Sequence, residues 1–583
     1  MKAYKENLPK SLIRKINDRL DFLYAHKAGA EFREKLLELV GKHVDTHNKG
    51  GERWNEKDMI LITYGDSVIN YGEPGLKVLH RFLNKHFRDT LSTVHILPFF
   101  PYSSDDGFSV IDYTGVNPDL GDWSHLESLR TDYKLMFDLV INHISRRSEW
   151  FTNYLQNVHP GRDFFIEAHP GDDLSKVVRP RSLPLLTPFE KPEGTKYLWT
   201  TFSDDQIDLD FSNPEVLFEM MKILLFYLAR GASMIRLDAI AFLWKKPGTS
   251  CIHLPETHEV VKLMRDIMEA ADPHSILLTE TNVPNDENLS YFGNGDEAHM
   301  VYQFSLPPLL LHALYSGNAS YLTQWASGKS DIPPGCTFFN FTASHDGIGV
   351  RPLEGLLPEE ELIELIAVMK TNGGMISTRR TSDGKDRPYE LNITYFDAMK
   401  RARHGRDHRQ FERFISSQTI MMEMKGIPAF YIHSLLGTQN YYEGVEETGR
   451  ARSINRRKWK ENEIEGLLAE ENLHSRVMQR LNRIMHTRRH QKAFHPDAAQ
   501  EILDFGNEFF ALRRTSTDKK QVIVCITNVT AIAATVDKNR VKGRIPDFDL
   551  FTKRSPAAAT DTFELEPYQT VWLTDGNYFK RDD

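Results

Sequence analysis

The sequence predicts a (β/α)8 barrel, and two observations favour this fold class. Short apolar runs rich in β-branched and aromatic residues alternate with helix-like segments, and polar residues directly follow several of these runs. The expected strands are residues 59–63, 94–99, 135–141, 234–239, 276–279, 301–306, 337–343 and 429–432. Eight strands that alternate with helices are typical of a parallel barrel, whose functional residues gather at the carboxyl ends of the strands.

The rest of the chain adds three kinds of structure to the barrel. Apolar residues at helical spacing precede it, two intervals between expected strands are too long for simple crossovers, and alternating strand patterns follow it. The expected domains are an N-terminal helical extension at 1–55, barrel segments at 56–142, 213–347 and 403–490, inserted lobes at 143–212 and 348–402, and a C-terminal β-sandwich domain at 491–583.

Composition excludes several classes of protein. With 583 residues, 40% of them hydrophobic, the chain can bury several cores, and a net charge of −9 without a basic stripe argues against nucleic-acid binding. Cys251, Cys336 and Cys525 lie far apart, outside any metal-ligand spacing, and are interpreted as reduced thiols of a cytoplasmic protein. No apolar stretch of about 18 residues occurs, so we expect neither a signal peptide nor a membrane partner.

Three acidic residues carry the expected chemistry. Each of them, Asp238, Glu280 and Asp346, lies at the end of a predicted barrel strand. A single acid at such a position would ordinarily be a helix cap or a surface charge. Arg236 lies two residues before Asp238, so strand alternation directs both side chains to one side. The positive charge of Arg236 is then expected to keep the Asp238 carboxylate ionised. Three such acids at one rim favour a catalytic site over three separate structural roles.

Four segments resemble the conserved regions of the α-amylase superfamily, glycoside hydrolase family 13. They are DLVINH at 138–143, GASMIRLDA at 231–239, LLTET at 277–281 and SHDGIG at 344–349. The resemblance implies a retaining mechanism, in which two carboxylates lie about 5 to 5.5 Å apart. It makes Asp238 the nucleophile, Glu280 the acid/base, and Asp346 the carboxylate that binds two sugar hydroxyls. Within the superfamily, the sequences at 95–113, 248–251, 304–314 and 453–456 resemble the sucrose phosphorylase branch.

That branch implies a pocket for a single glucosyl unit. By position, Asp105 and Arg452 would grip the outer hydroxyls, and Phe108 and Phe202 would form aromatic walls, although core packing is an alternative for the two rings. The full set expected at the glucosyl subsite is Asp105, Phe108, His143, Phe202, Gln206, Arg236, His345 and Arg452.

The acceptor side departs from sucrose phosphorylases. Arg387 and Glu390 replace an Asp and a Gln that touch fructose, Phe242 replaces a Tyr, and Arg181 adds a guanidinium suited to phosphate or carboxylate. With Tyr389, these residues are expected to bind the acceptor or phosphate, and a solvated surface is the alternative for the basic segment. The segments at 179–189 and 388–392 resemble the glucosylglycerate phosphorylases.

The resemblance implies reversible phosphorolysis of glucosylglycerate by inorganic phosphate, giving glucose 1-phosphate and glycerate. No cofactor and no resident metal are expected, because this branch generally lacks the calcium site of the superfamily. Three alternatives stay open. The acceptor could be that of a sucrose, sucrose 6'-phosphate or glucosylglycerol phosphorylase; water or a sugar could intercept the intermediate, as in an α-glucosidase or transglucosylase; or the chain could be a non-catalytic carbohydrate-binding protein.

Overall fold

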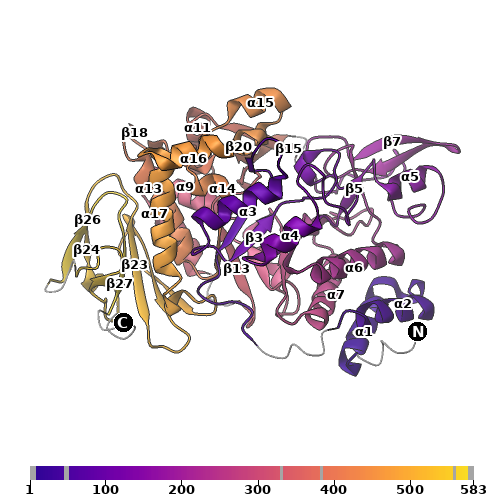
Figure 1. Cartoon of the computed structure of the whole chain (residues 1–583), viewed down its shortest axis with the longest axis horizontal. Coiled ribbons are helices and arrows are strands. Elements are labelled where there is room, and N and C mark those ends of the chain that lie inside the picture. Colours follow the sequence, from indigo (N-terminus) through magenta and orange to yellow (C-terminus); the bar gives the residue numbers. More distant parts are fainter. Residues whose placement is uncertain (1–7, 45–50, 329–331, 381–384, 556–559, 576–583) are drawn as a thin grey trace.

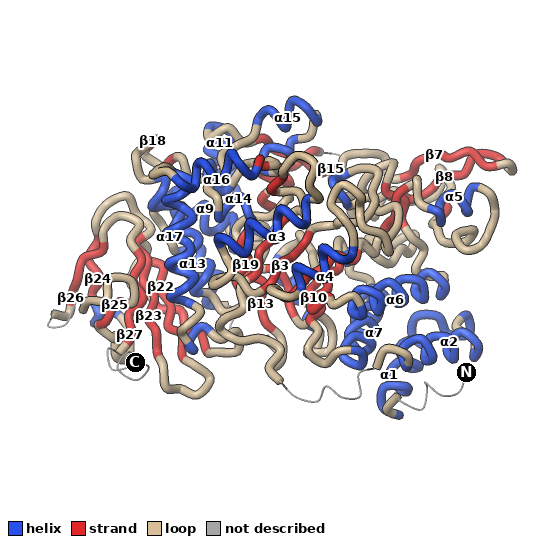
Figure 2. The backbone as a smooth tube through the Cα atoms, in the orientation of Figure 1, coloured by secondary structure: helices blue, strands red, loops and turns tan. Residues whose placement is uncertain are grey.

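The eight expected strands form a closed parallel barrel. The computed structural model describes residues 8–44, 51–328, 332–380, 385–555 and 560–575. In spatial order the barrel strands are β1 (Ile60–Thr63), β19 (Ile427–Tyr431), β13 (Thr337–Phe341), β12 (Met300–Tyr302), β11 (Ile276–Thr279), β10 (Ala232–Leu237), β4 (Lys134–Leu139) and β3 (Thr93–Ile96). The strands are almost entirely buried because helices cover their outer sides, which explains their continuous apolar runs (Figure 2).

Capping residues mark the N-termini of helices that cover the barrel. Asp122 and His125 form a reciprocal capping box at α4 (Trp123–Arg130), and Asn213 caps α6 (Pro214–Ala229), whose first residue is a proline. The other helices around the barrel are α3 (Gly75–His86), α7 (Pro255–Ala271), α9 (Leu306–Ser316), α13 (Gln410–Glu423) and α17 (Leu473–Arg488). Among the described residues, none of the helices is both long enough and apolar enough to cross a bilayer.

The N-terminal helices are attached to the barrel. α1 (Lys10–Tyr24) and α2 (Ala30–Gly41) lie beside α6 and α7 (Figure 1). Arg19 donates to Asp266 over 2.6 Å and to Glu259 over 2.7 Å, both on α7. These ion pairs are largely withdrawn from solvent, so they fix the helical pair against one side of the barrel.

Both long intervals carry small sheets at the end of the barrel that holds the pocket described below. The first contains β5 (His143–Ser145), which pairs with β9 (Gln206–Asp208), and a sheet of β6 (Glu167–Ala168), β8 (Gly194–Trp199) and β7 (Leu186–Lys191). The second contains β14 (Ile348–Gly349), β16 (Asp386–Asn392) and β15 (Met375–Arg380). These sheets bring chain segments from both intervals over the carboxyl ends of the barrel strands.

Two sheets follow the barrel at the C-terminal side. One contains β21 (Ala499–Leu503), β22 (Phe509–Thr515), β23 (Val522–Asn528), β27 (Thr570–Thr574) and β25 (Phe548–Asp549); the other pairs β24 (Ala534–Asp537) with β26 (Thr562–Leu565). An apolar core that includes Val524 and Phe563 lies between them. Trp572 anchors the larger sheet to the barrel, because its indole Nε1 donates to Glu423 on α13 over 2.6 Å.

Candidate active site

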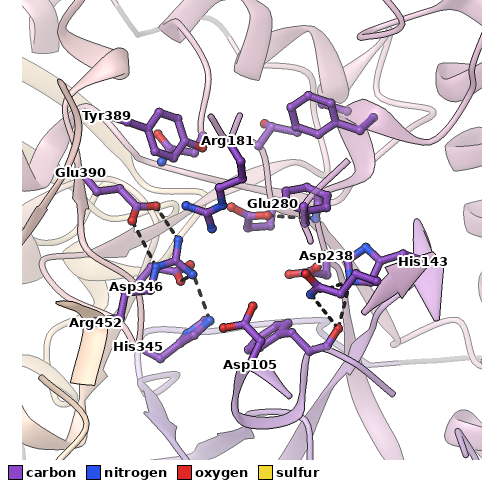
Figure 3. Close-up of a pocket in the computed structure, with 18 residues that line it drawn as sticks. Asp105, His143, Arg181, Asp238, Glu280, His345, Asp346, Tyr389, Glu390 and Arg452 are labelled. Carbon is purple, nitrogen blue, oxygen red and sulfur yellow. Dashed lines mark hydrogen bonds and ion pairs between the residues drawn. The ribbon is translucent and has the colours of Figure 1, made fainter. Parts of the chain in front are cut away.

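A pocket at the carboxyl ends of the barrel strands brings together most of the expected site residues. Those that line it are Asp105, Phe108, His143, Arg181, Phe202, Gln206, Asp238, Glu280, His345, Asp346, Tyr389, Glu390 and Arg452 (Figure 3). Arg236 lies beneath the pocket, where it contacts Asp238. Arg387 does not reach the pocket.

The floor of the pocket is an ionic network around Arg236. Its Nη1 donates to Asp238 over 2.8 Å and also to Asp138, and its Nε donates to the Tyr302 hydroxyl over 3.1 Å. Asp138 is fully buried and in turn lies 2.7 Å from His95 Nε2. Because strand alternation directs residues 236 and 238 to the same side, the guanidinium is fixed beside the Asp238 carboxylate, as the sequence predicts.

Glu280 and Asp238 share this guanidinium at different distances. Glu280 Oε2 lies 3.7 Å from Arg236 Nη2, almost an ångström farther than the contact at Asp238, and accepts from the Ala239 amide over 3.0 Å. Burial raises the pKa of Asp238, and Arg236 opposes this rise. Burial and the neighbouring charges of Asp238 and Asp346 raise the pKa of Glu280 to about 7. Glu280 can thus act as an acid near neutral pH, and the closer guanidinium favours the ionised form at Asp238.

Asp346 is held ionised by basic neighbours. Burial would raise its pKa, but the guanidinium groups of Arg452 and Arg456 lower the pKa below the usual range of an aspartate. Arg452 Nη1 lies 2.6 Å from Asp346 Oδ1. On its other side Arg452 donates to both oxygens of Glu390, over 2.6 and 3.1 Å. Glu390 therefore orients Arg452, a function that the sequence comparison with fructose-binding residues did not predict.

The two histidines are fixed by aromatic and polar contacts. The His345 ring stacks on Phe108 at 4.7 Å, and burial lowers its pKa well below the ordinary value, so the imidazole is neutral. His143 Nε2 lies 2.9 Å from the Phe108 carbonyl and 3.1 Å from Gln206 Nε2. The neutral His345 imidazole and the Gln206 amide suit hydroxyl groups, since they offer both donors and acceptors.

The loop that carries Asp105 depends on one glycine. Asp105 and Asp106 both have positive φ, and Gly107 follows at φ +112°, where an added Cβ would lie 2.4 Å from the Pro98 carbonyl. This turn directs Asp105 into the pocket, while Asp106 pairs with Arg456. Arg456 also donates to the His345 carbonyl over 2.8 Å, so it joins this loop to the one that carries Asp346.

The opposite end of the pocket holds an unengaged guanidinium. Arg181 lies over the Tyr389 ring at 5.9 Å, and among the residues that the structure describes it has no hydrogen-bond or ion-pair partner. In Figure 3 its side chain enters the pocket between Tyr389 and Glu280. Burial, Glu390 and Glu280 raise the pKa of Tyr389 to about 12, so the phenol stays a hydrogen-bond donor at neutral pH. This end is suited to an anion.

A β-bulge explains why Arg387 lies elsewhere. Ser377 pairs with Glu390 and Thr378 with Pro388, so Tyr389 is an extra residue in its strand. The bulge breaks the alternation of side chains and lets the consecutive residues Tyr389 and Glu390 both line the pocket. Arg387 pairs with Arg379 beyond the bulge and is exposed. The expected position of Arg387 over the acceptor therefore has to be corrected.

A lysine occupies the centre of a further polar cluster below the first lobe. Lys245 Nζ lies 2.7 Å from Asp208 and 2.5 Å from the side-chain oxygen of Asn142, and it is almost fully buried. No group of three or more His, Cys, Asp or Glu residues suited to a metal ion occurs in the described part of the chain. Lys245 thus supplies positive charge between two oxygens that could otherwise take part in binding a cation.

Several residues of this site escaped the sequence analysis. Asp138, Arg456 and His95 lie within the segments that carry the family resemblance, but they were assigned no role. Alternation could have identified Asp138, because it lies next to Arg236 on the neighbouring strand. Arg456 could not have been found in this way, since its partner Asp106 is 350 positions away in sequence.

Comparisons with known proteins agree with this geometry. Residues 90–330 match the family model of the α-amylase catalytic domain. The glucosylglycerate phosphorylase of Spirochaeta thermophila is 44% identical over 96% of this chain and 98% of its own length, and that of Escherichia coli is 44% identical over 96% and 99%. The crystal structure of sucrose 6F-phosphate phosphorylase from Thermoanaerobacter thermosaccharolyticum superposes with a TM-score of 0.71 at 27% identity, covering 83% of this chain and 96% of that one.

Proposed function

The chain belongs to the α-amylase family, within the group of relatives named glucosylglycerate phosphorylases, and from this premise we propose that it interconverts 2-O-α-glucosyl-D-glycerate and phosphate with α-glucose 1-phosphate and D-glycerate. The observation that carries the proposal is the pocket itself. It combines Asp238 and Glu280, two carboxyls in different electrostatic environments, with Arg181, a guanidinium without an ion-pair partner among the described residues.

The first half of the reaction transfers glucose to the enzyme. An oxygen of Asp238 attacks the anomeric carbon, the bond from that carbon to the glycerate oxygen breaks, and Glu280 gives its proton to the departing oxygen. Arg236 donates to Asp238 over 2.8 Å and favours its ionised form against the burial that raises its pKa, while the raised pKa of Glu280 keeps a substantial fraction of this carboxyl protonated near pH 7. Asp346 and Arg452 would meanwhile hold the sugar hydroxyls.

The second half returns the enzyme to its starting state. A phosphate oxygen attacks the anomeric carbon, the glucosyl ester breaks, and Asp238 regains its carboxylate. Glu280, ionised by the first step, accepts the proton that the attacking phosphate gives up, so charge and protons balance over the cycle. The leaving group, glycerate, and the nucleophile, phosphate, are both anions. Each can bind beside Arg181 during its own half of the reaction.

Phosphate recognition alone does not separate the candidate acceptors. The phosphorylases of sucrose, sucrose 6'-phosphate and glucosylglycerol share the catalytic carboxylates that the family resemblance implies, so the acceptor decides among them. Incubation with glucose 1-phosphate and one of D-glycerate, fructose, fructose 6-phosphate or glycerol, with phosphate release as the readout, tests the proposal. D-glycerate is expected to give the fastest release. A faster reaction with any of the other three would refute glycerate as the acceptor.

The same assay separates phosphorolysis from the more distant alternatives. An α-glucosidase would release glucose at an equal rate with or without acceptor, and a non-catalytic binding protein would release no phosphate. We place the reaction in the cytoplasm, which fits the three buried cysteines without disulfide bonds. The expected partners are small molecules alone.

A further inference from the structure

Arg351 is a largely buried cation that the proposed reaction does not use. It begins the short helix η6 (Arg351–Leu353), which follows β14, and its side chain is only 11% exposed. The guanidinium makes no hydrogen bond to any residue in the described part of the chain, and its Nε is fully buried. Buried polar atoms in folded proteins are nearly always paired, so this cation points to a partner that the chain itself does not supply.

Two carboxylates lie near Arg351, and both have closer partners. Glu287 Oε2 is 3.8 Å from Arg351 Nη2 but 3.0 Å from His253 Nε2. Glu354 accepts a hydrogen bond from Arg379 Nη2 over 2.9 Å. Neither carboxylate therefore reaches the Arg351 guanidinium at hydrogen-bond distance, which leaves its N–H groups available to an added anion.

A second arginine is joined to the same turn. The Glu354 amide donates to the Arg351 carbonyl over 3.0 Å, and the Glu354 carboxylate holds Arg379 of β15. The Arg379 side chain is 16% exposed, and its buried Nε also lacks a hydrogen-bond partner within the described ranges. Burial and the charge of Arg379 lower the pKa of Arg351, so the two cations repel each other. An oxyanion bound by both guanidinium groups would offset this repulsion and accept from their unpaired N–H groups.

The two arginines lie beside Tyr389 but outside the catalytic pocket. The Val350 amide donates to the Tyr389 carbonyl over 3.0 Å, so Arg351 directly follows the contact that joins the two segments. Arg181 lies over the ring of the same tyrosine. Neither Arg351 nor Arg379 lines the pocket. An anion held by this pair would therefore be separate from the anion at Arg181, although both would adjoin Tyr389.

We propose that Arg351 and Arg379 form a second oxyanion site outside the catalytic pocket, which binds inorganic phosphate or the carboxylate of glycerate. The identity of these two anions rests on the proposed function. During turnover glycerate has to leave the pocket and phosphate has to enter it. A second site beside Tyr389 would hold one anion close to the pocket while Arg181 binds the other.

Thermal unfolding in the presence of added anions tests the site without catalysis. In Arg181→Ala the pocket has lost its own guanidinium, yet sodium phosphate or sodium D-glycerate, at constant ionic strength set with chloride, should still raise Tm, because a ligand that binds only the folded state stabilises it. Adding Arg351→Gln in this background should raise the anion concentration that gives half of the shift about ten- to a hundredfold, the loss expected for one charge-assisted contact. The anion that acts at the lower concentration is the preferred ligand.

Arg387→Gln is the matched control, because Arg387 is the exposed register partner of Arg379 on the same sheet. It removes the same charge and should change the half-saturating concentration less than about twofold, since an exposed charge acts only through screened solvent. Arg379→Gln should weaken the same shift even if Arg351→Gln does not fold. A shift that survives both Arg351→Gln and Arg379→Gln unchanged, or that falls equally in Arg387→Gln, would overturn the proposal.

The outcomes also separate this inference from the proposed function. Phosphate release from glucose 1-phosphate and D-glycerate by the wild type, without any anion-dependent shift of Tm in Arg181→Ala, retains the function and refutes only the second site. A shift that requires Arg351, in a protein that does not use D-glycerate as acceptor, refutes the function and retains the oxyanion site.

Discussion

The two ends of the pocket differ in how fully their polar groups are engaged. At the glucosyl end, Asp238, Asp346 and Arg452 each contact charged partners inside the protein. At the acceptor end, Arg181 has no such partner among the described residues. The glucosyl end is thus a preorganised site for a neutral ring, whereas the acceptor end is completed by the ligand.

This contrast predicts where substitutions act. A change at the glucosyl end removes an oriented group and should reduce turnover with every acceptor. A change at the acceptor end should alter affinity for particular acceptors and leave the glucosyl-enzyme step intact. Each prediction below tests one side of this difference, beginning with the largest effect.

Asp238→Asn should cause the largest loss, because an amide cannot form the glucosyl ester. We expect kcat to fall by at least about a thousandfold with every acceptor and without loss of the fold. Phosphate release from glucose 1-phosphate measures the rate, and thermal unfolding checks the fold. Asp204→Asn, at an exposed acid outside the pocket, is the matched control. Retention of more than a tenth of the wild-type rate would remove Asp238 from the role of nucleophile.

Glu280→Gln should reduce activity less than Asp238→Asn, and the reduction should depend on the leaving group of the donor. General acid catalysis contributes about 10²- to 10⁴-fold, so phosphorolysis of glucosylglycerate should fall within that range. α-Glucosyl fluoride needs little protonation and should still glucosylate the variant, after which azide should accept the glucose. The acid/base assignment fails if the fluoride donor is affected as severely as glucosylglycerate.

Arg181→Ala tests the acceptor end. Loss of one charge-assisted contact to an ionised group costs about 1.5 to 3 kcal/mol, which corresponds to a rise of about ten- to a hundredfold in the KM for D-glycerate or phosphate. Transfer to glycerol should change much less, because glycerol has no charge. If all acceptors suffer equally, Arg181 shapes the pocket as a whole and does not recognise the anion.

The pH dependence of the first half-reaction should reflect Glu280. Its pKa of about 7 means that the acid form disappears as the pH rises, so kcat/KM for glucosylglycerate should fall about tenfold per unit above pH 7. This parameter excludes the phosphate step in a two-step mechanism, and it therefore avoids titration of phosphate. α-Glucosyl fluoride should show a flatter alkaline limb. An equally steep limb for the fluoride would place the titrating group elsewhere.

The sequence predicted the glucosyl end better than the acceptor end, and the reason is physical. Strands buried on both faces are readable as apolar runs, and polar residues at their ends fall on the rim of the barrel, as with Asp238 and Glu280. The acceptor end is built from lobes, where side-chain direction depends on register. The bulge at Tyr389 follows from pairing with β15, which no local pattern in the sequence indicates.

Arg387 marks the boundary of the acceptor end and provides the smallest predicted effect. Its backbone pairs with Arg379 beyond the bulge, and its side chain is exposed outside the pocket, so it can act on a bound anion only through solvent. Arg387→Ala should change the KM for D-glycerate and phosphate less than about twofold. Any difference should vanish between 0.02 and 0.2 M salt, roughly the range over which screening shortens long-range attraction. Arg181→Ala, measured in parallel, should retain most of its effect at high salt because its contact is direct. A tenfold rise in KM for Arg387→Ala at high salt would mean that this arginine reaches the acceptor, and the boundary drawn from the bulge would then be wrong.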